Sequence, residues 1–295
     1  LHAASHCLTV TTAYHGAARG VQIDALRVEA RGALDLQGFL GLNDRVRPGF
    51  KHIHLDVHVD SPSPREEVEA LLRYTTGRSP ICTTRQQPVA LEWDLEVEAT
   101  GGPPDEGAVR HGVDYPALAA TVAAVKETPA VAKCEFQSRT EWLGGARMRS
   151  EQIGFDQGEG AGKIEHRDAP PLGYLGDEPT QLLGGDAGPS PSETLLHAMA
   201  NCVSVTASYH AAARGLDLQA LEAELRGDMD LQGFADLDDR VTPGYQRVRV
   251  RLRARGGGDA AALRDLLTFA AEHSPMCESV RAPVHMTFAL HHRQR

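Results

Sequence analysis

The segment Leu1-His2-Ala3-Ala4-Ser5-His6-Cys7 opens the chain, and the similar segment Leu196-His197-Ala198-Met199-Ala200-Asn201-Cys202 recurs in its second half. The same offset, without a gap, relates other pairs: Arg31-Gly32 and Arg226-Gly227, Asp35-Leu36-Gln37-Gly38-Phe39 and Asp230-Leu231-Gln232-Gly233-Phe234, and Cys82 and Cys277. Such self-similarity indicates two tandem repeats of one long unit. Each repeat carries two cysteines at the same spacing, Cys7 with Cys82 and Cys202 with Cys277.

The composition of the chain is that of an ordinary globular protein. Its 295 residues are 41% hydrophobic and 24% charged, with a net charge of −10. This length predicts about two domains, and the negative charge argues against nucleic acid or an anionic membrane as partner. No apolar run approaches the roughly 20 residues that cross a bilayer. Without a signal peptide, a cytoplasmic protein is expected.

The second repeat is expected to begin with a long helix over about 191–214. Ser190 and Glu193 have the spacing of a capping box, and Gly215 is a typical C-terminal stop. Apolar residues occur all round the helix, which predicts burial on most of its faces. Strict alternation over 246–253 then predicts a half-buried strand with an outer face of arginines.

The rest of the second repeat reads as a strand at 216–229, a helix at 259–273, a loop carrying Cys277 and a strand at 283–290. The first repeat has the matching helix at 64–77 and strand at 88–95. Before the second repeat, a helix is expected at 114–127 and two strands, 131–143 and 146–155, joined at Gly144-Gly145. This order is typical of an α+β fold.

The domain organisation follows from these patterns. Residues 1–95 are expected to form a partial repeat without its N-terminal hairpin, 96–111 a linker and 112–295 a complete unit. Leu1 lies inside a helical pattern, so we expect the chain to be truncated relative to a complete first repeat.

Five cysteines in a cytosolic chain favour reactive, metal-binding or core roles over disulfides. Cys134 lies in a strand-like stretch and is interpreted as a small buried residue. Cys202 is mid-helix, so a cation from elsewhere would have to lower the pKa of its thiol. It would then react with a peroxide and be resolved by Cys277 as a disulfide. The alternative is that both are core cysteines.

Histidines are the other candidate ligands. His52, His54 and His58 share one strand face, but arginines occupy the matching positions of the other repeat, and a solvated face is expected. The histidines that recur with the cysteines do not lie three or four residues from them, so we predict neither a metal nor a cofactor.

The segment Pro191-Ser192-Glu193-Thr194-Leu195-Leu196-His197-Ala198-Met199-Ala200-Asn201-Cys202 resembles the central-helix motif of the OsmC/Ohr proteins. Tyr209-His210-Ala211-Ala212-Ala213-Arg214-Gly215 and Ser274-Pro275-Met276-Cys277 add to the match. The resemblance implies long buried central helices wrapped by antiparallel sheets, arranged here as a tandem pseudo-dimer. It also implies a thiol-dependent peroxidase that reduces organic hydroperoxides and is recycled by a dithiol.

Under this resemblance, Cys202 and Cys7 are the peroxide-reacting cysteines, and Cys277 and Cys82 resolve them. The activating arginine comes from the hairpin, where Arg147 is favoured over Arg149.

Two departures from the family pattern keep an alternative open. Ser192 stands where the family has an acidic partner for the arginine, and Glu193 reads first as a capping residue. The first repeat also lacks its own hairpin, which would leave strand edges that favour self-association. The alternative is a non-catalytic relative that binds a small apolar ligand between the domains.

Overall fold

The structure is a computed structural model that describes residues 1–159, 164–166 and 172–294. The first repeat forms α1 (His2–Arg19), β1 (Ala25–Asp35), α2 (Leu36–Phe39), β2 (His52–Ser61), α3 (Arg65–Arg78), α4 (Pro80–Gln86) and β3 (Ala90–Ala99). The second repeat forms α6 (Pro191–Arg214), β10 (Leu218–Asp228), α7 (Leu231–Phe234), β11 (Arg247–Gly256), α8 (Ala260–His273), α9 (Pro275–Arg281) and β12 (His285–Gln294). The two repeats therefore have the same order of elements.

The segment between the repeats adds a hairpin and several short elements. They are β4 (Val109–Arg110), β5 (Val113–Asp114), α5 (Tyr115–Glu127), η1 (Pro129–Ala132), β6 (Lys133–Gly144), β7 (Arg147–Gln157), β8 (Ile164–His166), β9 (Gly173–Gly176) and η3 (Thr180–Leu182). The predicted helix and hairpin are confirmed to within a few residues. Part of the Gly-rich stretch at 158–162 lies outside the described residues.

Local signals set the ends of the central helix α6 as predicted. The Ser190 side chain accepts a hydrogen bond from the Glu193 N–H, and the Glu193 carboxylate accepts one from the Ser190 N–H at 2.8 Å. At the other end, Gly215 adopts the left-handed conformation with φ 65°, which favours glycine. The capping role predicted for Glu193 is confirmed.

The two long helices differ in burial. In α1 every residue from Ala3 to Thr12 is buried. The prediction that the second-repeat helix is buried on most faces is confirmed for all but one stripe, since Val205 and Tyr209 of α6 are 46% and 39% exposed. Together with the exposed Asn201, these residues form a stripe along α6 that lines a cavity.

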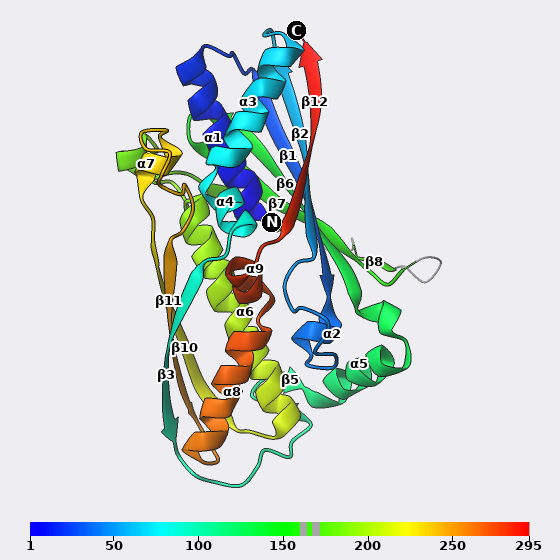
Figure 1. Ribbon diagram of the computed structural model, residues 1–295. Helices are drawn as coiled ribbons and strands as arrows, with labels where there is room; N and C mark the ends of the chain where they lie inside the picture. The colour runs from blue at the N-terminus through cyan, green and yellow to red at the C-terminus, as the bar shows by residue number, and fades with distance from the viewer. Residues whose placement is uncertain (160–163, 167–171, 295) are drawn as a thin grey trace.

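Each repeat gives its closing strand to the sheet of the other. One sheet has the order β12-β2-β1-β6-β7-β8, with β9 also paired to β7. A second, three-stranded sheet has the order β10-β11-β3, and β4 and β5 form a two-stranded sheet. The closing strands β3 and β12 run parallel to β11 and β2, whereas the other pairs are antiparallel. In Figure 1 the red strand β12 lies beside β2, while β3 lies far from it beside β11. The repeats are therefore interlocked as an intrachain pseudo-dimer.

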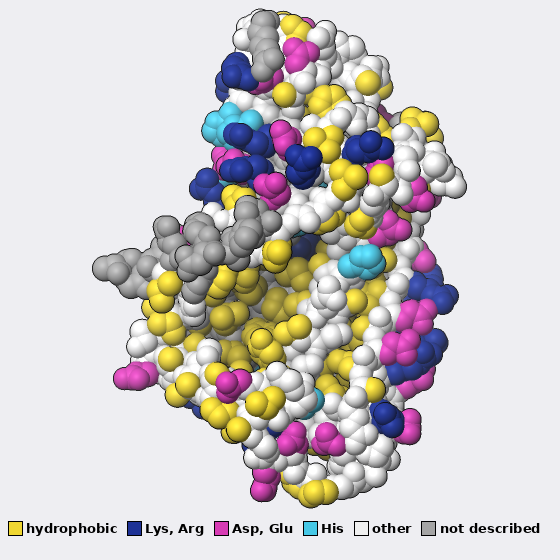
Figure 2. Space-filling model, turned by 180° about the vertical axis from the view of Figure 1, so that it is seen from behind, with side chains coloured by type: hydrophobic (Ala, Val, Ile, Leu, Met, Phe, Trp, Pro, Cys, Tyr) yellow, Lys and Arg dark blue, Asp and Glu magenta, His cyan; other side chains and the backbone are white. Residues whose placement is uncertain are grey.

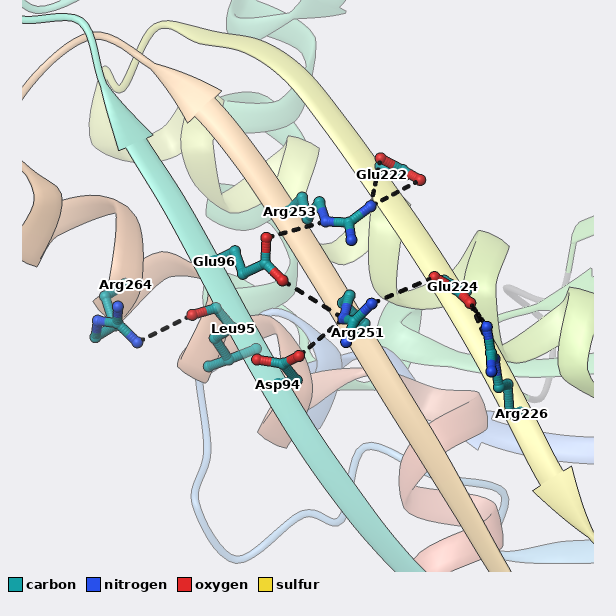
Figure 3. A network of polar contacts seen from close by, with 9 residues as sticks. All are labelled: Asp94, Leu95, Glu96, Glu222, Glu224, Arg226, Arg251, Arg253 and Arg264. Carbon is teal, nitrogen blue, oxygen red and sulfur yellow. Dashed lines mark hydrogen bonds and ion pairs between the residues drawn. The ribbon is translucent and has the colours of Figure 1, made fainter.

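Charged side chains line the outer face of the three-stranded sheet, where the sequence predicted a row of arginines. Arg251 lies 2.8 Å from Asp94 on β3, and 3.8 Å from Glu224 on the other side. Arg253 pairs with Glu96 and Glu222 in the same way (Figure 3). Exposed ion pairs add little stability one by one, but this alternation of charges favours β3 as the neighbour of β11.

Equivalent contacts across the repeats show the pseudo-two-fold relationship. The Phe50 N–H donates to Oγ of Ser279 at 2.8 Å, and the Tyr245 N–H donates to Oγ1 of Thr84 at 2.8 Å. Likewise, Nε2 of His15 lies 3.0 Å from the Phe234 carbonyl, and Nε2 of His210 lies 3.0 Å from the Phe39 carbonyl. Buried residues of both repeats form one continuous hydrophobic core.

Two predicted boundaries are corrected. Cys277 and Cys82 lie in the short helices α9 and α4 rather than in loops, because a serine followed by Pro at the first helical position starts a new helical turn. The strand predicted at 88–95 continues to Ala99, inside the predicted linker. Within the described residues, no helix is long and apolar enough to span a membrane.

Candidate functional site

A cavity of about 890 Å³ lies beside the exposed stripe of α6. Its wall is mainly apolar, and residues of α1, α2, α4, α6 and α9 and of β1, β6 and β7 line it. Among its lining residues are Leu36, Phe39, Phe136, Leu195, Val205 and Met276. On the back of the molecule, a hollow surrounded by hydrophobic side chains is visible in Figure 2. Such a cavity can hold an apolar small molecule.

Cys202 lies on the wall of this cavity. It is the half-buried member of a set of five free cysteines, since Cys7, Cys82, Cys134 and Cys277 are all buried. Burial acts to raise the pKa of the Cys202 thiol, and the Ser274 side chain, the Met276 N–H and the Arg85 charge act to lower it. The net direction is upward, so the neutral thiol is favoured.

Cys277 is near enough to Cys202 for a charge on Cys202 to act on its thiol. Burial raises the pKa of Cys277 to about 12, opposed by the Ser274 side chain, and a negative charge on Cys202 raises it further. The Ser274 side chain at the start of α9 thus acts to lower the pKa of both thiols. The structure brings together the two cysteines that the sequence paired.

The corresponding cysteines of the first repeat are enclosed. The Ile81 N–H lies 3.4 Å from Sγ of Cys7, and Cys7 and Cys82 are 4% and 0% exposed. Burial raises the pKa of Cys7 to about 12 and that of Cys82 to about 11. The cavity beside Cys7 measures only about 30 Å³, because residues of the 178–192 segment help to close it.

A carboxylate stands close to the Cys7 thiol. Glu178 lines the small cavity and is only 9% exposed. Burial, with the charges of Glu193 and Asp177, raises the pKa of Glu178 to about 7. When ionised, Glu178 also acts to raise the pKa of Cys7. A negative neighbour disfavours a thiolate at this site.

The hairpin arginines lie apart from Cys202. Nε of Arg147 is 3.7 Å from Oδ2 of Asp177, and the side chain is half exposed. Backbone N–H groups of Gly185 and Ala187 bind the same carboxylate. Arg149 is an exposed residue of β7, in register with Glu141 and Leu175. For the described residues, no contact of Arg147 or Arg149 with a cysteine is found, because β6 and β7 extend the sheet of the first repeat.

Sequence analysis did not single out Arg85. Its side chain reaches from α4 into the wall of the cavity that contains Cys202, and the residue is 2% exposed. Burial lowers the pKa of Arg85 to about 10, while Cys82 and Cys202 act to raise it. The sequence held a signal for this residue, because the equivalent position of the second repeat is Val280.

The other candidate ligands and nucleophiles either stack on neighbouring side chains or are buried in the core. His52, His54 and His58 lie on the outer face of β2, where His52 stacks on His285 and His58 on His291. Over the residues that the structure describes, no group of histidine, cysteine and carboxylate side chains has the geometry of a metal site. Cys134 is 6% exposed in β6, as expected of a small buried residue.

A family model described as OsmC-like protein matches residues 1–94 and 184–289. The chain is also similar to a solved structure from Psychrobacter arcticus 273-4, described as an osmotic stress induced and detoxification response protein. That match has 15% identity and a TM-score of 0.37, covering 52% of this chain and 94% of the other. An OsmC-like protein from Mycoplasma pneumoniae matches at 14% identity and a TM-score of 0.34, with coverage of 48% and 94%. No curated protein gave a significant match.

Proposed function

The chain belongs to the OsmC-like protein family, and on this premise we propose that it is a thiol-dependent peroxidase for organic hydroperoxides. Cys202 is the peroxide-reacting cysteine and Cys277 the resolving one. The observation that carries the proposal is the position of Cys202 on the wall of an apolar cavity of about 890 Å³, next to Cys277. An apolar cavity favours a hydroperoxide with a hydrocarbon group over hydrogen peroxide.

The reaction proceeds in two steps on the protein. The Cys202 thiolate attacks the outer oxygen of the hydroperoxide, the O–O bond breaks, and the alkoxide takes up a proton and leaves as an alcohol. Cys202 is then a sulfenic acid. The Cys277 thiol condenses with it, so that an S–S bond forms and water leaves, and an external dithiol reduces the disulfide.

Three groups around Cys202 support this role by favouring its thiolate. They are the Ser274 side chain, the Met276 N–H and the Arg85 charge. Arg147, the residue that the family resemblance assigns to this task, is paired with Asp177. Cys7 and Cys82 remain candidates by repeat symmetry, but the small cavity and Glu178 make Cys202 the favoured site.

A test of the proposal compares single cysteine variants of the full chain. C202S is expected to abolish turnover of cumene hydroperoxide with a dithiol as reductant, whereas C134S retains it. C7S, matched to C202S in chemistry and in repeat position, is expected to retain most of the activity. Full activity in C202S would overturn the proposal.

The second candidate function is binding of an apolar ligand without turnover. It is favoured by the same cavity together with the net upward direction of the Cys202 pKa. In that case C202S binds an apolar dye or ligand as tightly as the unmodified protein, and neither form consumes hydroperoxide.

A further inference from the structure

Arg85 places a buried positive charge beside the cavity, and no carboxylate in the described part of the chain pairs with it. The residue is 2% exposed, and its Nε and Nη1 atoms have no hydrogen-bond partner among the residues that the structure describes. Its Nη2 atom lies 4.0 Å from Sδ of Met276, and the guanidinium lies 5.9 Å from the centre of the Phe50 ring. Sulfur and an aromatic ring compensate a buried cation only weakly. The site therefore favours an anion next to Arg85.

The groups around Arg85 identify that anion. Those that interact with its charge are Cys82, Cys202 and the amino group of Leu1. Of these, only the two thiols become negative. Cys82 is 0% exposed in the core, whereas Cys202 is half-buried and lines the cavity. A thiolate forms and reacts at Cys202 with less desolvation than at Cys82.

The second repeat has no cation at the position equivalent to Arg85, where it would act on Cys7. Val280, fully buried, occupies the position equivalent to Arg85, so no cation reaches Cys7 from α9. Glu178 instead places a carboxylate near Cys7. The two cysteine sites therefore have opposite electrostatic surroundings despite the sequence repeat.

We propose that Arg85 of the first repeat is the counter-ion of the Cys202 thiolate of the second repeat, so that both repeats build one reactive thiol site and the Cys7 site stays unreactive. Arg85 takes the place that the family resemblance gives to the hairpin arginine. The inference concerns thiol reactivity, and only its use in peroxide reduction rests on the proposed function. Arg85 of α4 and Cys277 of α9 interact electrostatically with Cys202, and the ionisable residues His2 of α1 and Tyr209 of α6 line the same cavity.

The test measures alkylation of each cysteine in the reduced full chain by peptide mass spectrometry, over roughly pH 6 to 10. The variants are R85M, R85K and, as the matched arginine control, R147M. R85M is expected to raise the pH midpoint of Cys202 alkylation by about one unit and to slow alkylation near neutral pH about tenfold. R85K restores part of the rate, and R147M leaves it unchanged. In every form Cys202 reacts faster than Cys7.

Thermal unfolding separates this role from a structural one. Replacing a buried, poorly compensated charge by the similarly shaped methionine is expected to keep or raise the Tm while reactivity falls. An unchanged Cys202 midpoint in R85M, or an equal shift in R147M, would overturn the inference. If Cys202 is alkylated in an Arg85-dependent way but cumene hydroperoxide does not oxidise it, the peroxidase proposal fails and this inference stands.

Discussion

Nη2 of Arg85 lies 4.0 Å from Sδ of Met276, the residue that directly precedes Cys277. A side chain from the first repeat thus reaches the helix that carries Cys277 of the second. This contact exists because α4 and α9 pack together at the centre of the pseudo-dimer, each followed by a strand that crosses to the other sheet. The site is therefore a product of the interlocked fold, and changes in either repeat should alter it.

The apolar wall of the cavity should select bulky hydroperoxides. Val205 lines the cavity and is 46% exposed, so Val205→Asp places a charge where the hydrocarbon group of the substrate would lie. We expect kcat/KM for cumene hydroperoxide to fall about tenfold, which corresponds to one apolar contact, with little change for hydrogen peroxide. Steady-state kinetics with both peroxides measures this. Leu237→Asp, at a site 75% exposed, is the control and should leave both values unchanged.

Glu178 should make stability fall as pH rises. The pKa of Glu178 is about 7 in the folded protein, above its ordinary value of 4.5, because of burial and the charges of Glu193 and Asp177. The folded state therefore binds a proton more tightly than the unfolded state. The associated stability is fully present below about pH 4.5 and is lost as pH rises through 7.

Glu178→Gln should remove this part of the pH dependence. Urea unfolding measures the free energy of unfolding of both forms at about pH 5 and about pH 8. At each pH, taking the difference between the two forms cancels the titration of other groups. The variant is expected to gain stability relative to the unmodified chain at the higher pH. An equal difference at both pH values would show that Glu178 titrates normally.

Neighbouring residues of β11 should differ sharply in their contribution to stability. Leu252 is 1% exposed in the shared core, so Leu252→Ala is expected to lower the free energy of unfolding by about 2–5 kcal/mol. Arg251 lies in the exposed row of ion pairs, and Arg251→Ala should cause a small loss that disappears at high salt. Denaturant unfolding at low and high salt distinguishes the two. A loss for Arg251→Ala as large as for Leu252→Ala would contradict the account of this sheet.

Local signals in the sequence predicted the elements well. Ser190, Glu193 and Gly215 define α6, and the alternation from Arg247 to Arg253 identifies a strand and its outer face. These patterns depend on neighbours in the chain. The repeat paired Cys202 with Cys277, and the family resemblance added the pseudo-dimer.

The exchange of β3 and β12, in contrast, depends on pairs of residues more than a hundred positions apart, such as Trp93 with Val250. No local pattern encodes a parallel partner at that distance. For the same reason no local pattern marks Arg85, although the structure buries it beside Cys202. The hairpin arginine Arg147 was favoured on resemblance alone, and its position followed from the pairing of β6 with β1.

The most direct test of the central claim is the oxidation state of each cysteine after one equivalent of cumene hydroperoxide is added to the reduced full chain. Intact mass, thiol count and a peptide map are measured together. We expect two thiols to be lost per chain, with Cys202 linked to Cys277 and with Cys7, Cys82 and Cys134 still reduced. Thiols that all stay reduced, or a disulfide that joins Cys7 to Cys82 instead, would contradict it.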